Sequence, residues 1–302
     1  MNEVSPVFTD YATITTPPEH LDDVMASLKP WLDASLCYVD VKSSPEVMRW
    51  RSPSGGLLTV KARSYGVSIY TASGGFMSDL RQSGLQATFL AAFSSFPHNV
   101  SSADFTVDEY RDDVPSRLVD IYELAAAGHV SFTRKHIGRS AIRRLFRPSL
   151  YNDCDETGTL YIGKRGSHEV HCKCYDKRNE SLDRTGRDIG RNTLRHEMTV
   201  SGKMGLTLRD LDQPHDCFYH FYPSNLLSTA QKTTWQGYGE GFEVKRPEKR
   251  LASQILAGKV EASMELASML RLADEVGQHG LDYFIRLLRE RHNRLHSSSL
   301  AA

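Results

Sequence analysis

The sequence predicts an α+β fold, in which an antiparallel sheet with packed helices is followed by a helical C-terminal region. Short runs of β-forming residues, separated by Ser-Pro and Gly-Gly turn signals, occur up to about residue 200. Amphipathic helical patterns lie among these runs and dominate the rest of the chain. A sheet-rich part followed by a helix-rich part is typical of the α+β class.

The first part of the chain predicts a strand meander packed on a helix. A helix is expected after Pro17 and Pro18, because apolar residues recur at helical spacing from Leu21 to Leu32 and proline suits a first helical turn. Three short strands are expected next, at 37–41, 57–62 and 67–70. A second helix, at about 76–93, precedes a further strand with the sequence ADFTVD at 103–108.

The middle of the chain predicts more strands, and the last third predicts helices. Helices are expected at 114–127 and 140–146, with a short strand at 130–133 between them. Three further strands are expected at 159–162, 169–175 and 194–200, and long amphipathic helices at 251–272 and 281–295. We therefore predict a sheet-rich core at 1–203, whose element order would allow two similar halves, a helical region at 204–302, and a disordered tail from about 296.

The charge balance excludes one class of protein. The 302 residues include 37 Lys and Arg and 37 Asp and Glu, so the formal net charge is zero and a protein that coats nucleic acid without specificity is excluded. Neither an apolar run of about 18 residues nor a signal-like start is found, which predicts an unsecreted protein with no membrane partner. The five cysteines form no CxxC pair and are expected to be reduced thiols in a cytoplasm.

Three predicted strands place ionisable side chains on one face. Because side chains alternate along a strand, ADFTVD separates an apolar set from Asp104, Thr106 and Asp108. The strands at 169–175 and 194–200 separate in the same way. Their polar sets are His171, Lys173 and Tyr175, and Arg195, Glu197 and Thr199. Each face could simply meet water, as in any sheet covered on one side.

If these strands are neighbours, their polar faces form a carboxylate cluster beside a tyrosine and two cations. Oxygen ligands favour Mg²⁺ or Mn²⁺ over zinc, so Asp104, Asp108 and Glu197 are the predicted metal ligands, with Asp176 and Glu180 as substitutes. Such a group of residues suits phosphoryl transfer, in which a metal polarises a phosphate oxygen and a tyrosine attacks.

Four ordered segments resemble the replication initiation factor family, which includes rolling-circle plasmid initiators, filamentous-phage initiators and some relaxases. They are ADFTVDEY at 103–110, TLYIGKRGS at 159–167, CYDKRNE at 174–180 and LRHEM at 194–198. The resemblance covers roughly residues 100 to 205. It departs from the family's pattern after Tyr161-Ile162, where Gly-Ser is common and this chain has Gly163-Lys164-Arg165. The His-x-His metal motif of the other large class of rolling-circle nickases is absent from the sequence.

The resemblance implies a metal-dependent nick of one DNA strand, which leaves a 5′-phosphotyrosine link and a free 3′-OH. The family places its nucleophile in the segment that ends in Tyr-(Asp/Asn/Glu)-Lys, which is Tyr175 here, and Tyr161 is the rival position. Lys173 and Arg195 would stabilise the phosphate. Since a tyrosine is mostly protonated at neutral pH, we expect cations or the metal to favour its phenolate.

Basic residues provide a candidate DNA-binding surface. Between 134 and 147 the chain carries six Lys or Arg and no acid, and Arg139, Arg143 and Arg147 would form one stripe on a helix. A solvated surface is the alternative. The full predicted set is Arg134, Lys135, Arg139, Arg143, Arg144, Arg147, Lys164 and Arg165.

The resemblance also sets the expected partners and the alternatives. The partners are double-stranded origin DNA, its nicked single strand, and a helicase and polymerase of a bacterial host, and members of the family often act as homodimers. A relaxase of a mobile element would use the same chemistry. A non-catalytic origin-binding or regulatory protein is the alternative from another class, and retention of all the ionisable residues on the polar face argues against it.

Overall fold

The structure is a computed structural model, which describes residues 3–34, 37–44, 46–64, 66–132, 135–136, 142–147, 157–163, 169–227 and Trp235. The chain divides into two compact units, Met1–Val244 and Lys245–Ala302, and every described residue belongs to the first. The helices predicted at 251–272 and 281–295 and the predicted tail lie outside the described residues.

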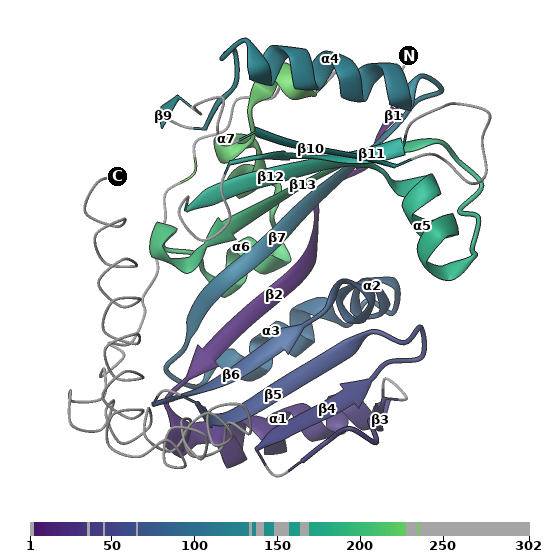
Figure 1. The fold of residues 1–302 in the computed structure, drawn as a ribbon. Helices are drawn as coiled ribbons and strands as arrows, with labels where there is room; N and C mark the ends of the chain where they lie inside the picture. Colours follow the sequence, from purple (N-terminus) through teal and green to yellow (C-terminus); the bar gives the residue numbers. More distant parts are fainter. Residues whose placement is uncertain are drawn as a thin grey trace, which may run out of the picture. The chain divides into compact units, whose positions relative to one another are not determined.

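An antiparallel sheet is the centre of the first unit (Figure 1), and the predicted α+β class is confirmed. Its strands follow the order β10-β11-β12-β13-β7-β2-β6-β5-β4-β3, and β1 pairs with the end of β7. The strand bounds are β1 (Glu3–Val4), β2 (Phe8–Thr16), β3 (Tyr38–Val39), β4 (Val47–Arg51), β5 (Leu57–Ser64), β6 (Val67–Ala72), β7 (Asn99–Tyr110), β10 (Ile142–Arg147), β11 (Thr157–Ile162), β12 (Val170–Asp176) and β13 (Thr193–Ser201). A separate short hairpin consists of β8 (Ser131–Phe132) and β9 (Lys135–His136).

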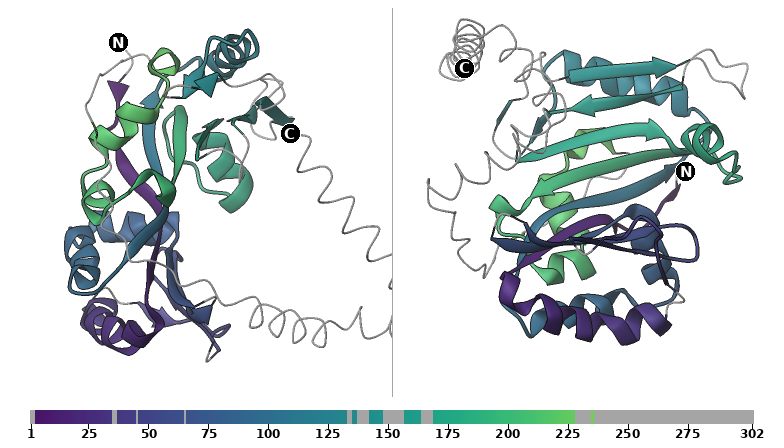
Figure 2. Two further views of the ribbon diagram at one scale, coloured as in Figure 1. Left: turned by 90° about the vertical axis from the view of Figure 1, so that its left-hand side faces the viewer. Right: turned by 60° about the horizontal axis from the view of Figure 1, so that its bottom comes forward.

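The order of helices and strands repeats along the chain. One strand, one helix, three main strands and a second helix occur as β2-α1-β4-β5-β6-α2 and again as β7-α4-β10-β11-β12-α5, and Figure 2 shows the two groups of strands joined in one sheet. The helix bounds are α1 (Leu21–Ala34), α2 (Gly74–Gln82), α3 (Gln86–Ser94), α4 (Val114–Ala126), α5 (Lys177–Thr185), α6 (Leu208–Asp212) and α7 (His215–Phe221).

The hydrophobic core includes aromatic side chains that pack edge to face. The ring centroid of Phe89 lies 5.6 Å from those of Phe76 and Phe93 and 6.0 Å from that of Trp31. The apolar sets predicted for the strands are buried as expected, with Phe105, Val107, Cys172, Cys174, Leu194, Met198 and Val200 at most 1% exposed. Their burial leaves the alternate residues of the same strands on the opposite face of the sheet.

Several predicted elements are wrong in detail. The helix expected at 76–93 is two helices, because the chain turns at Ser83 and Gly84, and Gly84 has a φ of +71° that glycine adopts readily. The helix expected at 140–146 is strand β10, which pairs with β11 from Ile142 to Arg147. Cross-strand pairing therefore overrides the i+4 spacing of its arginines. Strands β2 and β4 were not predicted.

The predicted domain boundary at residue 203 falls inside the first compact unit. Helix α6 packs on α3 and β2, and the hydroxyl of Thr9 on β2 donates to the Leu211 carbonyl at 2.7 Å. These contacts tie the segment after β13 to the sheet. Among the described helices, none combines the length and the apolar character that crossing a bilayer requires.

Candidate active site

The polar sets of three predicted strands lie side by side, because β12, β13 and β7 are consecutive in the sheet. In the pairing register, Tyr175 lies opposite Arg195, which lies opposite Asp108. Lys173 lies opposite Glu197, and Thr199 lies opposite Asp104. Since directly paired residues project from the same face of an antiparallel sheet, these side chains share one surface.

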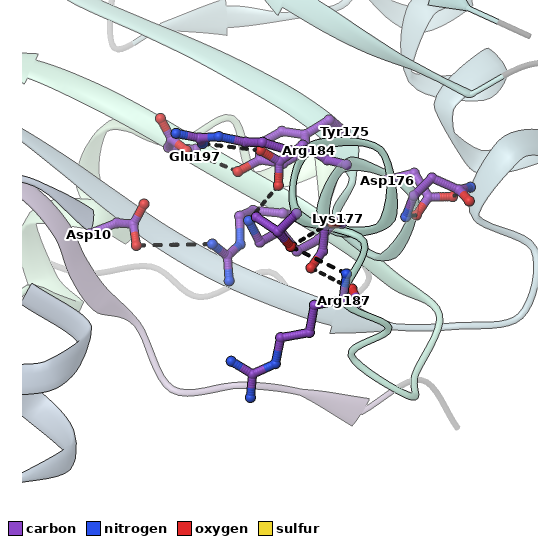
Figure 3. A network of polar contacts seen from close by, with 12 residues as sticks. Asp10, Tyr175, Asp176, Lys177, Arg184, Arg187 and Glu197 are labelled. Carbon is purple, nitrogen blue, oxygen red and sulfur yellow. Dashed lines mark hydrogen bonds and ion pairs between the residues drawn. The ribbon is translucent and has the colours of Figure 1, made fainter. Parts of the chain in front are cut away.

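Tyr175, Glu197 and Lys173 form the centre of this surface (Figure 3 shows Tyr175 beside Glu197). The Tyr175 hydroxyl donates to Glu197 Oε2 at 3.3 Å, and Lys173 Nζ lies 2.5 Å from Glu197 Oε1. Lys173 and Lys177 also place their Nζ atoms 5.3 and 5.9 Å from the centre of the Tyr175 ring. Tyr175 and Glu197 are 7% and 4% exposed. The tyrosine is therefore held between two ammonium groups and hydrogen-bonded to a buried carboxylate.

The Arg195 charge lowers the pKa of the Tyr175 phenol, as predicted for a nearby cation, but it does not outweigh burial. Burial raises the pKa of the Tyr175 phenol well above its usual value, and the Glu197 charge raises it further, whereas Arg195 opposes both. The phenol in this structure is thus a proton donor. The group placed to receive its proton is Glu197, to which the hydroxyl already donates.

Arg195 joins Tyr175 to two further carboxylates. Its Nε and Nη2 atoms lie 2.6 and 2.7 Å from the two oxygens of Asp108, a bidentate pair. Its Nη1 atom lies 3.9 Å from Oδ1 of Asp10, a residue of β2 that the sequence prediction missed. Asp10 occurs where the register between β2 and β7 shifts, between Thr9 and Tyr11. Asp10 is the single acid within FTDYATITT at 8–16. It could have been found from the sequence only if this segment had been recognised as a strand.

The three carboxylates predicted to bind a metal are not gathered at one point. In the part of the chain that the structure describes, no group of three or more His, Cys, Asp or Glu is arranged to hold a metal ion. Asp108 is occupied by Arg195. Asp104 accepts from Thr199 Oγ1 at 2.6 Å and shares a hydrogen bond with Glu197. Burial first, and then the Glu197 charge, raises the pKa of Asp104 to about 7. Asp104 and Glu197 offer adjacent carboxylate oxygens that fit a divalent cation, whereas both oxygens of Asp108 are engaged by Arg195.

The two substitute ligands have structural roles at α5. Asp176 is the N-cap of α5 and accepts from the backbone and side-chain nitrogens of Asn179 at 3.0 and 2.6 Å. Glu180 pairs with Lys177 at 2.6 Å and with Arg184 at 3.4 Å. Strand β12 ends at Asp176, the residue after Tyr175, and α5 begins at Lys177. The cap therefore fixes where the chain turns from the strand that carries Tyr175 into the helix.

The rival nucleophile Tyr161 lies on the same surface. It is opposite Lys173 in the β11–β12 pairing and is half-buried. Of the predicted DNA-binding residues, Arg134, Arg139, Lys164 and Arg165 lie outside the described residues. For Lys135, Arg143, Arg144 and Arg147 the structure describes only the backbone, on β9 and β10. The predicted helical stripe does not form, because β10 is a strand.

A buried polar network lies on the opposite face of the same strands. His196 Nε2 lies 3.1 Å from Glu109 Oε2, and His196 Nδ1 lies 2.6 Å from the Tyr222 hydroxyl. Arg111 Nη1 reaches the other oxygen of Glu109 at 3.2 Å, and the Cys174 thiol lies 3.6 Å from His196 Nδ1. Each residue of this network is a neighbour in sequence of a residue on the polar face. His196 lies between Arg195 and Glu197, Glu109 follows Asp108, and Cys174 precedes Tyr175. This network thus holds the strands in the register that aligns the polar face.

Several solved structures are similar to this chain. One of them is the rolling circle replication initiator protein from Geobacillus stearothermophilus, which aligns with 73% of this chain and 86% of its own at a TM-score of 0.45 and 14% sequence identity. No protein-family model matches the sequence, and no curated protein matches it.

Proposed function

We propose that the protein is a rolling-circle replication initiator that nicks one strand of origin DNA with Tyr175. The observation that carries the proposal is the contact between the Tyr175 hydroxyl and Glu197, on a sheet face that also presents Lys173 and Arg195. A tyrosine hydrogen-bonded to a carboxylate and flanked by cations is the arrangement that phosphoryl transfer to a phenol requires. The four sequence segments that resemble replication initiators support the same reading.

The reaction assigns a role to each of these side chains. The Tyr175 oxygen attacks the phosphorus of one phosphodiester while Glu197 takes the phenolic proton. The bond from phosphorus to the 3′-oxygen breaks, so the 5′-phosphate stays on the tyrosine, and the 3′-oxygen takes up a proton from water and leaves as a 3′-OH. Lys173 and Arg195 stabilise the negative charge that develops on the phosphate oxygens. The reverse reaction with a new 3′-OH transfers the strand and frees the tyrosine.

We also propose that Asp104 and Glu197 hold Mg²⁺ or Mn²⁺. A bound cation would polarise a phosphate oxygen of the substrate. The support is the carboxyl pair itself: Asp104 lies beside Glu197, and burial first and then the Glu197 charge raise the pKa of Asp104 to about 7. Duplex origin DNA would lie against the basic residues at 134–147 and 164–165, which remain the predicted phosphate contacts.

The proposed activity can be tested with a supercoiled plasmid that carries the protein's coding sequence and its flanking DNA. Incubation with the wild-type protein and Mg²⁺ or Mn²⁺ should convert supercoiled circles to relaxed circles that carry covalently attached protein. Digestion with protease before electrophoresis should release the attached protein but leave the nick. Nicks without attached protein would contradict a tyrosine-linked intermediate, and binding without any nick would favour a non-catalytic origin-binding protein.

Replacing Asp104 should change how stability depends on pH. The Asp104 carboxyl has a pKa of 3.8 when unperturbed and about 7 in the folded protein. Between these values the folded state keeps a proton that the unfolded state has released, so the free energy of unfolding falls as pH rises from about 4 to about 7. In EDTA at pH 8, Asp104→Asn should therefore be more stable than the wild type, by on the order of 2 kcal/mol. Thermal unfolding as a function of pH measures this difference.

The same variant tests the metal proposal without any activity. Mg²⁺ should raise the melting temperature of the wild type by mass action and leave that of Asp104→Asn nearly unchanged. Asp33→Asn is the matched control, because Asp33 is 65% exposed on α1 and pairs only with exposed Lys29 among the described residues. Equal stabilisation of all three proteins by Mg²⁺ would exclude Asp104 as a ligand.

A further inference from the structure

A groove with a basic rim lies at the far end of β7 and β13 from Tyr175. Its volume is about 890 Å³, and its walls are the segment after α3, the start of β7, and the turn that leads from β13 to α6. Ser201, which ends β13, is six residues from Arg195, the partner of Tyr175 in the register. At about 3.3 Å per residue the groove is thus roughly 20 Å from the candidate active site.

The chemistry of the groove favours an anionic ligand. None of the residues that line it is an Asp or Glu, whereas Lys203, Arg209 and His98 are among them. Lys203 and Arg209 are exposed, and the described residues offer neither side chain an ion-pair partner. The nearest acid along the chain, Asp210, is not among the lining residues, and its oxygens accept from Thr207 Oγ1 and from Trp235 Nε1 at 2.8 and 2.7 Å. Two cations are therefore left to face solvent at the rim.

The shape of the groove depends on a close contact between two backbone segments, the turn after β13 and the start of β7. A Cβ atom on Gly202 would lie 2.2 Å from the carbonyl oxygen of Val100, so only glycine allows the turn after β13 to press against the start of β7. Gly205 follows in the left-handed region with a φ of +80°. Ser101, Ser201 and Phe96 are also among the lining residues. The groove thus brings together basic, hydroxyl-bearing and aromatic residues, which are the residue types that bind single-stranded nucleic acid.

We propose that this groove binds a nucleotide of single-stranded DNA, with its phosphate on Lys203 and Arg209. The inference rests on the proposed function, since the DNA strand bound in the groove would be the strand that becomes single-stranded after the nick. The volume is within the range of about 300–1,000 Å³ that holds a drug-sized ligand, which is room for one or two nucleotides. The site holds the nicked strand at a point remote from the tyrosine.

The test is the salt dependence of binding to a fluorescent 12-nucleotide single strand, measured by fluorescence anisotropy. All proteins carry Tyr175→Phe, so that binding is read without cleavage. Lys203→Ala/Arg209→Ala should weaken binding at least tenfold at low salt. It should also reduce the slope of log Kd against log salt by about 0.7, since the two cations share one phosphate and each phosphate contact contributes about 0.7. Lys29→Ala/Lys42→Ala removes two exposed cations elsewhere and should change neither quantity.

Two outcomes would overturn the proposal. One is an unchanged affinity and slope in Lys203→Ala/Arg209→Ala, when its melting temperature matches that of its parent. The other is displacement of the oligonucleotide by dTMP at the same nucleotide concentration, which would assign the groove to free nucleotides. Nicking is assayed separately, with the protein that retains Tyr175. A smaller salt slope in Lys203→Ala/Arg209→Ala, together with no covalent adduct in the nicking assay, would support DNA binding in the groove and contradict the proposed nicking activity.

Discussion

We expect replacement of Tyr175 by phenylalanine to abolish the proposed covalent protein–DNA adduct, and Tyr161→Phe to retain it. The reason is the position of each hydroxyl: that of Tyr175 donates to Glu197 at 3.3 Å, and its ring lies between Lys173 and Lys177. Phenylalanine keeps the ring and removes the nucleophilic oxygen, so the loss is complete rather than partial. An oligonucleotide labelled at its 3′ end measures the adduct, since the label stays on the strand whose 5′ end joins the protein.

Tyr161→Phe is the matched control for this experiment. Both tyrosines project from the same face of neighbouring strands, and both variants lose one hydroxyl without leaving a cavity. The free energy of unfolding should fall by only about 1 kcal/mol in Tyr175→Phe, because Glu197 keeps its contact with Lys173. An adduct that persists in Tyr175→Phe and disappears in Tyr161→Phe would move the nucleophile to β11.

Glu109→Gln is expected to lower the free energy of unfolding by about 3 kcal/mol or more. Glu109 is fully buried and lies between Arg111 and His196, at 3.2 and 3.1 Å. The neutral amide leaves His196 buried without its carboxylate, and removal of one partner from a buried pair costs more than the pair itself contributes. Chemical denaturation at constant pH measures the loss.

An exposed glutamate provides the control for Glu109→Gln, because it shows the effect of removing a carboxylate that is not buried. Glu123→Gln, on the exposed side of α4, makes the same chemical change and should alter stability by less than about 0.5 kcal/mol. Glu109→Gln should also reduce formation of the adduct at temperatures well below its melting point, because the network aligns the strands that carry Tyr175, Arg195 and Glu197. Wild-type stability in Glu109→Gln would show that His196 is neutral and needs no counter-charge.

The fold class and the polar face of the sheet could be predicted because both depend on local pattern. Period-two alternation located β7, β12 and β13 and assigned Asp104, Lys173 and Glu197 to one side of their strands. The pattern of β10 was misleading, since arginines at i+4 spacing suit a helix until a neighbouring strand offers hydrogen bonds. Asp10 could not be assigned, because its position depends on an irregular pairing between β2 and β7 that no local pattern records.

The sequence by itself determined which side chains each strand offers to its polar face, because alternation is a property of a single strand. Which of them meet was decided only by the tertiary structure, through the order β12-β13-β7-β2 and its register. That order brings the Tyr175 hydroxyl to Glu197 and keeps Asp104 beside Glu197, whereas Asp108, the third carboxylate predicted as a metal ligand, pairs with Arg195. The physical reason is that interactions between charges depend on distances of a few ångströms, and these distances are fixed only when the strands pair.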